Sequence, residues 1–169
     1  MTGQALFLKI NNLTNPIWLD KLAIFFAVYI GFLLLVFLGY LWFSRPASRR
    51  MVMVALIAAG IARLGITNII RFFYPHPRPF DVMQVRQLIP ENGSSFPSGH
   101  ASFFFALSAA IYLYDRKLGW FFFVVSALMG VARVYVGVHW PLDILGGIAV
   151  GIITAILVNR IYKKIYDHL

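Results

Sequence analysis

Residues 21–43 read KLAIFFAVYIGFLLLVFLGYLWF, and no charged side chain follows Lys21 in this stretch. An uninterrupted apolar run of this length is what an α-helix needs to cross the hydrocarbon core of a bilayer. Four further apolar stretches follow along the chain, at residues 51–73, 99–114, 118–137 and 142–162. The sequence therefore predicts an all-α polytopic membrane bundle of about five transmembrane helices.

The composition of the 169-residue chain is that of a membrane protein. Residues of the AVILMFWYC set make up 60% of it and charged residues 12%, against roughly 45–50% apolar and about 25% charged in soluble domains. A soluble domain of this size could not bury so much apolar surface. The first twenty residues are mixed in polarity, and we expect a short interfacial helix and a turn there. Since no low-complexity segment interrupts the pattern, residues 1–169 are predicted to form one integral membrane domain.

The positive charges of the loops predict the orientation of the helices. With five crossings, the loops at residues 44–50 and 115–117 and the C-terminal segment share one side of the membrane. This side holds eight of the fifteen Lys and Arg residues, namely Arg45, Arg49, Arg50, Arg116, Lys117, Arg160, Lys163 and Lys164. Positively charged loops stay in the cytoplasm. The N-terminus and the loops at 74–98 and 138–141 are therefore expected on the outer face of the cytoplasmic (inner) membrane.

The net charge of +9 does not indicate a nucleic-acid-binding protein. The basic residues mark separate short loops, whereas nucleic-acid binders carry a continuous basic stripe. The chain has no cysteine, which excludes disulfides and thiolate metal sites. Its few carboxylates form no cluster of metal ligands along the sequence, so we predict neither a metal nor a cofactor.

Permanent cations occur where the apolar stretches meet the expected outer loops. Arg71, Arg78 and Arg133 are expected to meet on this face, with Asp143 as the nearest anion. Charged residues at such positions are costly in a membrane and mark functional sites. Because a guanidinium presents a planar fork of donors that matches carboxylate or phosphate oxygens, the pattern predicts an anion-binding site.

The third apolar stretch begins with Ser98, Gly99 and His100. Serine is a favoured residue at a helix N-cap, and the amides at a helix start bind anions. A second histidine, His139, lies four residues before Asp143, so a carboxylate one turn into the last helix can fix the tautomer of its imidazole. An arginine-rich site with two histidines and one orienting acid indicates phosphoryl transfer.

Three motifs in this order resemble a known family. The pattern Arg71-x6-Arg78-Pro79, Pro97-Ser98-Gly99-His100 and Arg133-x5-His139-x3-Asp143 is similar to the three-part motif of type 2 phosphatidic acid phosphatases. Within this superfamily the chain most resembles the bacitracin-resistance-type undecaprenyl pyrophosphate phosphatases. The resemblance covers residues 71–143 closely. Two positions depart from the family pattern, because Arg71 stands where lysine is usual and Ala132 where serine is usual.

The resemblance implies a role for each motif residue. His139 would attack phosphorus and form a phosphohistidine, with Asp143 holding its other ring nitrogen, while His100 would protonate the leaving oxygen and later activate water. The substrate phosphate would be bound by the guanidinium groups, a hydroxyl and an amide, which belong to Arg71, Arg78, Arg133, Ser98 and Gly99. No metal takes part in this scheme.

The function implied by the resemblance is hydrolysis of a polyprenyl (undecaprenyl) pyrophosphate to the monophosphate and inorganic phosphate. The expected partners are this lipid phosphate and membrane lipids, and the oligomeric state is left open. Alternatives of the same class are phosphatidylglycerophosphate, phosphatidate and lipid A phosphatases. A non-catalytic lipid-phosphate binder or flippase is an alternative of another class, although binding alone would not need the two histidines and the acid.

Other polar residues receive structural interpretations. Arg63 lies within the second apolar stretch, and we expect it to pair with a polar group inside the bundle rather than extend the anion site. His76, between two prolines, is expected to be a loop residue, and Asp81 and Glu91 to be solvated loop charges. The repeat Gly147-x3-Gly151 suits close helix packing, within the chain at least as well as in a dimer.

Overall fold

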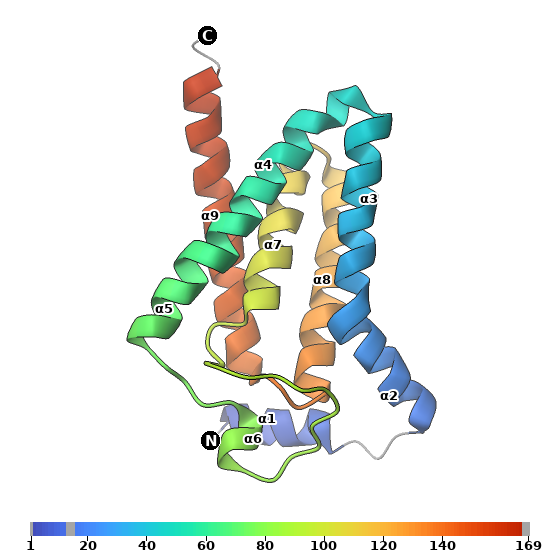
Figure 1. The fold of residues 1–169 in the computed structure, drawn as a ribbon, viewed down its shortest axis with the longest axis vertical. Helices are drawn as coiled ribbons and strands as arrows, with labels where there is room; N and C mark the ends of the chain where they lie inside the picture. The colour runs from blue at the N-terminus through green and yellow to red at the C-terminus, as the bar shows by residue number, and fades with distance from the viewer. Residues whose placement is uncertain (1, 13–15, 167–169) are drawn as a thin grey trace.

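The computed structural model describes residues 2–12 and 16–166, and within these ranges every regular element is a helix. A short helix α1 (Thr2–Asn11) comes first. It is followed by a long helical rod made of α2 (Ile17–Ile24), the π-helical segment η1 (Phe25–Tyr29) and α3 (Ile30–Ser44), in which α2 is tilted relative to α3 (Figure 1). After the 3-10 turn η2 (Pro46–Ser48), a second rod consists of α4 (Arg49–Gly60), the π-helical segment η3 (Ile61–Ile66) and α5 (Thr67–Phe73). The remaining helices are α6 (Pro79–Val82), α7 (Gly99–Tyr112), α8 (Arg116–Tyr135) and α9 (Pro141–Tyr166).

Four helices in the described part of the chain are long and apolar enough to cross a membrane. They are the rods Ile17–Ser44 and Pro46–Phe73 and the helices Arg116–Tyr135 and Pro141–Ile165. The fifth predicted crossing, α7, has 14 residues and is therefore about 21 Å long. It lies in the middle of the bundle between the other helices (Figure 1), and 11 of its 14 residues are buried. The bundle thus consists of four long helices around one short central helix.

Small residues allow α9 to lie directly against α7. A Cβ atom at Gly147 would come within 2.6 Å of the Ala101 Cβ, and one at Gly151 within 2.6 Å of the Ser102 carbonyl oxygen. Small residues at membrane-helix contacts let backbones approach closely in this way. The Gly147-x3-Gly151 repeat therefore serves helix packing within the chain, which is one of the two roles predicted for it.

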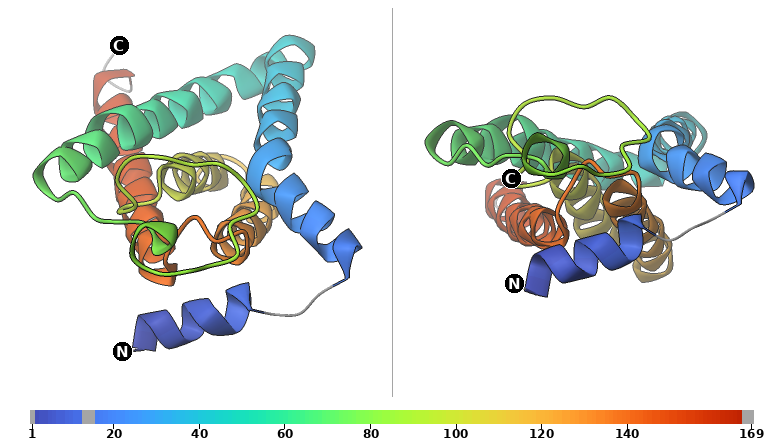
Figure 2. Two further views of the ribbon diagram at one scale, coloured as in Figure 1. Left: turned by 60° about the horizontal axis from the view of Figure 1, so that its bottom comes forward. Right: turned by 90° about the horizontal axis from the view of Figure 1, so that it is seen from below.

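The two ends of the bundle hold different parts of the chain (Figures 1 and 2). Helices α1 and α6, the long loop at 74–98 and the turn at 136–140 gather at one end, whereas the α3–α4 and α7–α8 connections and the last turns of α9 lie at the other. The basic loops and the predicted site loops are therefore at opposite ends. Helix α1 lies across the site end, where the Phe7 ring packs 5.0 Å from the ring of Trp140. The turn expected after this helix falls on residues 13–15, outside the described ranges.

Candidate active site

The turn between α8 and α9 holds the first histidine of the site. This turn reverses the chain at Gly137, whose φ of 84° is a conformation that glycine adopts without steric cost. It places His139 so that the imidazole Nδ1 lies 3.2 Å from Oδ2 of Asp143, and both side chains are only 1% exposed. The spacing of four residues predicted this contact, and the structure confirms it.

The Asp143 carboxylate is itself held in place. Its Oδ2 accepts hydrogen bonds from the backbone N–H of Trp140 at 2.8 Å and from the hydroxyl of Ser95. The Asp143 carbonyl also accepts from the N–H of Ser98 at 2.9 Å, which ties α9 to the start of α7. With its Nδ1 donating to this fixed acceptor, the His139 ring presents the lone pair of Nε2 for chemistry. Ser95 is a site residue that sequence reasoning did not identify.

The surroundings of His139 keep its imidazole neutral. Burial lowers the pKa of His139 to about 4; the hydrogen bond to Asp143 opposes this shift, and the positive charge of Arg133 adds to it. Removing a histidine from water disfavours its charged form. A neutral imidazole with a free lone pair is the form that can act as a nucleophile.

Arg133 lies at the end of α8 and is 2% exposed. Its NH1 group donates to the carbonyl of Ala27 in η1 at 3.3 Å, and its NH2 group forms an ion pair with Glu91. Its Nε is buried and has no hydrogen-bond partner among the described residues. A buried donor without a partner costs free energy, and a phosphate oxygen would satisfy it.

The expectation that Glu91 is a solvated loop charge was wrong. Its carboxylate is half-buried between two arginines, paired with Arg133 and 3.8 Å from the NH2 group of Arg78. Although burial raises the pKa of Glu91, the charges of Arg133 and Arg78 lower it below the ordinary value. Because the arginines attract any anion, the long loop folds so that its own carboxylate lies among them.

Arg78 is buried and is bonded to the backbone on several sides. Its guanidinium donates to the carbonyls of Gly93 at 2.8 Å, Val138 at 2.9 Å and Asn92 at 3.0 Å. Burial lowers the pKa of Arg78, whereas Glu91 and Asp143 raise it. Arg78 thus joins the long loop to the turn that carries His139. It also adds positive charge to the site.

Arg71 has a similar backbone contact. Its Nε and NH2 groups both donate to the carbonyl of Pro97, at 3.2 and 2.9 Å. A lysine could make only one such contact at a time, since it has no planar fork. Arg71 therefore fixes the segment before α7, and its direct contact with a substrate phosphate stays a prediction.

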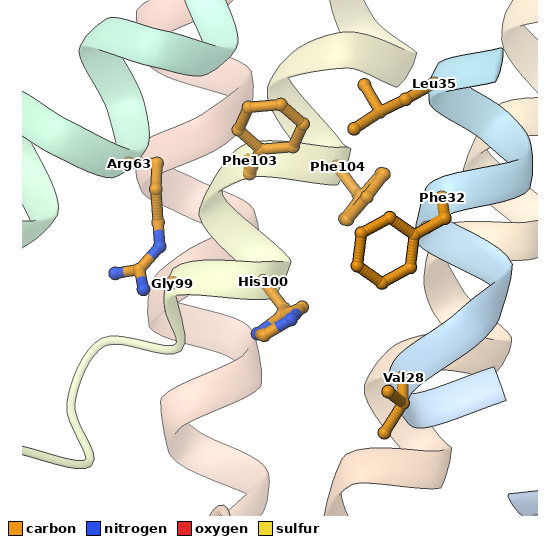
Figure 3. A pocket seen from close by; sticks show the side chains of 9 residues that line it. Val28, Phe32, Leu35, Arg63, Gly99, His100, Phe103 and Phe104 are labelled. Atoms are coloured by element: carbon orange, nitrogen blue, oxygen red, sulfur yellow. The ribbon is translucent and has the colours of Figure 1, made fainter. Parts of the chain in front are cut away.

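The start of α7 has the capping geometry that the sequence predicted. The Ser98 hydroxyl accepts from the N–H of Ala101 at 3.4 Å, and the side chain is fully buried. Next to it, a Cβ atom at Gly99 would overlap the guanidinium of Arg63. His100 follows and lines a cavity of about 250 Å³ together with Arg63 and several apolar side chains (Figure 3).

Two further polar residues shape the long loop. His76 accepts at its carbonyl from the N–H of Ser95 at 2.8 Å, so it is a loop residue as expected, although its Nδ1 is buried without a partner among the described residues. Asp81 is exposed, and its carboxylate accepts from the N–H of Arg78 at 2.9 Å at the start of α6. Within the described ranges, no three His, Cys, Asp or Glu side chains come together as a metal site requires.

A comparison with known families matches residues 50–167 to the family described as "PAP2 superfamily". The chain belongs to the PAP2 superfamily. The matched segment contains all three motifs, which confirms the resemblance drawn from them. This PAP2 chain, with its four long apolar helices, is a multi-pass membrane protein.

Relatives of this PAP2 chain are found among bacterial proteins of known name. The undecaprenyl-diphosphatase BcrC of Bacillus subtilis (strain 168) is 38% identical over 144 residues, which are 84% of this chain and 74% of the relative. The bacitracin transport permease protein BcrC of Bacillus licheniformis is 33% identical over 142 residues, which are 83% and 70% of the two chains. The crystal structure of Aquifex aeolicus LpxE superimposes with a TM-score of 0.81 at 30% identity, covering 95% of this chain and 96% of the other.

Proposed function

We propose that this PAP2 protein is a lipid phosphatase that hydrolyses a polyprenyl diphosphate to the monophosphate and inorganic phosphate. The observation that carries the proposal is the buried pair of His139 and Asp143 beside the guanidinium of Arg133. A neutral, oriented imidazole next to a cation with an unsatisfied donor can attack a phosphate and stabilise the charge that develops on it. The Bacillus subtilis relative, named an undecaprenyl-diphosphatase, supports the substrate class.

The reaction has two steps. In the first, Nε2 of His139 forms a bond to the terminal phosphorus, the bond from this phosphorus to the bridging oxygen breaks, and His100 gives its proton to the departing lipid monophosphate. In the second, His100 takes a proton from water, the hydroxide attacks the phosphohistidine, and inorganic phosphate leaves. Arg71, Arg78 and Arg133, the Ser98 hydroxyl and the Gly99 amide surround the transferred group, where preorganised donors have their largest effect.

The reaction is proposed to take place on the outer face of the cytoplasmic membrane. The basic loops lie at the end of the bundle opposite the site, and loops rich in Lys and Arg stay in the cytoplasm. The substrate phosphate would then be presented to the site from the outer leaflet.

A binder or flippase would keep the arginines but would not need an oriented nucleophile. To separate these functions, purified protein in detergent with EDTA is offered undecaprenyl diphosphate and phosphatidylglycerophosphate, and phosphate release is measured. We expect release from the diphosphate, and acid-labile phosphate on the protein after rapid quenching with labelled substrate. The His139→Ala variant should do neither while still binding the lipid. Phosphate trapped on His139→Ala would refute the nucleophile, and absence of release by the wild type would refute the phosphatase.

A further inference from the structure

Among the described residues, the guanidinium of Arg63 has no hydrogen-bond or ion-pair partner. Arg63 lies in the π-helical segment η3 of the second rod, and no hydrogen bond or ion pair joins it to another residue in the part of the chain that the structure describes. The expectation that it pairs with a polar group inside the bundle was therefore wrong. An unpaired cation within a transmembrane segment is costly and marks a functional position.

The guanidinium of Arg63 packs against the start of α7. This group lies against Gly99 so closely that any side chain at this position would overlap it. In Figure 3 the guanidinium of Arg63 and the imidazole of His100 both lie below Leu35 and Phe103, at the start of α7, and both line the 250 Å³ cavity. A cation is thus held beside the residue proposed to protonate the leaving group.

The cavity has both polar and apolar walls. Beyond Arg63 and His100 its walls are formed by apolar side chains of the two flanking helices, including Phe32, Leu35, Phe103 and Phe104. A ligand that fits it has an anionic end at the arginine and an apolar chain along the aromatic residues. A lipid with a phosphate group has this shape.

The charge of Arg63 adds to that of the other arginines. It is among the charges that act against protonation of Arg78, whose pKa is lowered first by burial. Glu91 and Asp143 compensate part of this positive charge, and an anionic ligand would compensate more of it. A diphosphate places two charged groups in series, so it can contact the cations around His139 and a further cation beyond His100.

We propose that Arg63 binds the phosphate that stays on the lipid, and that it makes the enzyme select diphosphates over monophosphates. This inference rests on the proposed function, in which His139 attacks the terminal phosphorus and His100 protonates the bridging oxygen. That oxygen leaves as part of the lipid monophosphate. The remaining oxygens of this group lie next to His100, where the guanidinium of Arg63 stabilises the charge that they gain as the bond breaks.

The test compares two soluble substrates that differ by one phosphate, farnesyl diphosphate and farnesyl monophosphate. The variants are Arg63→Met and Arg63→Lys, with Arg116→Met, an exposed residue at the opposite end of the bundle, as the matched control. Loss of hydrogen bonds to a charged group predicts that Arg63→Met lowers kcat/KM for the diphosphate about 10- to 100-fold. The monophosphate has no second phosphate, so its kcat/KM should change less than about threefold.

The two variants and the substrate pair separate selectivity from general damage. Arg63→Lys should recover part of the diphosphate rate because it restores the charge without the planar fork, and Arg116→Met should match the wild type. The role of Arg63 would be overturned by an equal loss of kcat/KM on both substrates. It would also be overturned if the ratio of kcat/KM for the diphosphate to that for the monophosphate were unchanged in both Arg63 variants. If Arg63→Met does not fold, the same kcat/KM ratio measured for Arg63→Lys is the test of the proposal. A wild type that hydrolyses neither substrate would refute the proposed function before any variant is compared.

Discussion

Ser95 holds the acid that orients the proposed nucleophile. Its hydroxyl and the Trp140 amide both donate to Oδ2 of Asp143, the same oxygen that faces His139. Since these bonds fix the carboxylate in one rotamer, they also fix the direction of the imidazole. Ser95 is therefore a positioning residue, because it acts on the reaction only through Asp143.

Removing the Ser95 hydroxyl should slow the chemical step more than it weakens substrate binding. A hydrogen bond to a charged group contributes about 1.5–3 kcal/mol, so Ser95→Ala is expected to lower kcat about tenfold or more with KM little changed. Ser94→Ala is the control, because among the described residues the Ser94 hydroxyl forms hydrogen bonds with the loop backbone alone. Steady-state kinetics of both variants check this. Equal losses in the two variants would contradict a specific role for Ser95.

The imidazole of His139 should stay neutral in mildly acidic solution. Its pKa is lowered to about 4, with burial as the main cause, from an ordinary value of about 6.5. The folded state thus disfavours protonation, so the stability contributed by neutral His139 is complete above pH 6.5 and is lost as the pH falls toward 4.

Histidine ¹³Cε1 NMR in detergent measures this pKa directly. The signal that disappears in His139→Gln identifies the residue, and we expect no shift of this signal between pH 7.5 and 5.5. A midpoint near 6.5 would contradict the lowered pKa and would mean that the ring is open to water.

At the level of secondary structure, the π-helical segments η1 and η3 lie where the two rods approach the site. The carbonyl of Ala27 in η1 accepts from Arg133, and η3 carries Arg63 to Gly99. π-helical turns inside α-helices often occur at functional sites. Both segments change the direction in which side chains and carbonyls project without ending the helix.

Contacts between neighbours in sequence could be predicted, and contacts between distant residues could not. The pair His139 and Asp143 and the Ser98 cap follow from helix geometry over three or four residues. The bonds of Ser95 to Asp143 and of Glu91 to Arg133 join residues 48 and 42 positions apart. Such pairs depend on how the long loop folds over the bundle, and no periodic pattern in the loop indicates this path.

The π-helical segments also had no signal in the sequence. Residues 25–29 and 61–66 are apolar apart from Arg63 and Gly65, and they contain no proline that would mark an irregularity. Helix α7 covers residues 99–112 of the predicted stretch at 99–114, but its central position in the bundle could not be predicted. Its apolar pattern resembles that of a full membrane crossing, because burial by protein and burial by lipid both favour apolar side chains.

The negative charge of Glu91 in the long loop is expected to compete with phosphate for the arginines of the site. Glu91 carries a negative charge between Arg78 and Arg133, where a phosphate would have to bind. Glu91→Gln removes this charge and is expected to lower the inhibition constant of inorganic phosphate about fivefold, since like charges at such distances repel by about 1 kcal/mol or more. Inhibition assays against the wild type and Asp81→Asn, an exposed acid of the same loop, check this. A weaker phosphate inhibition in Glu91→Gln would show that Glu91 is needed to position Arg133.

At the scale of the whole molecule, the separation of charges between the two ends of the bundle predicts one orientation in the membrane. The chain has no cysteine, so single cysteines report on each end without background. Asn92→Cys in the long loop should react with an impermeant thiol reagent in intact cells, whereas Ala47→Cys in η2 should react only after the cells are opened. Both residues are exposed. Labelling of Ala47→Cys alone in intact cells would place the site in the cytoplasm.

The cavity lined by Arg63 and His100 also indicates which measure of substrate concentration determines the rate. Its wall includes Phe32 of α3, which is 65% exposed on the apolar flank of the bundle. A molecule that arrives along this flank diffuses in two dimensions, so the encounter frequency follows the mole fraction of substrate among the surrounding amphiphiles. Adding inert lipid or detergent at a fixed substrate molarity should therefore slow turnover in proportion. Diluting the loaded micelles with buffer that maintains this mole fraction should leave the rate per enzyme molecule unchanged.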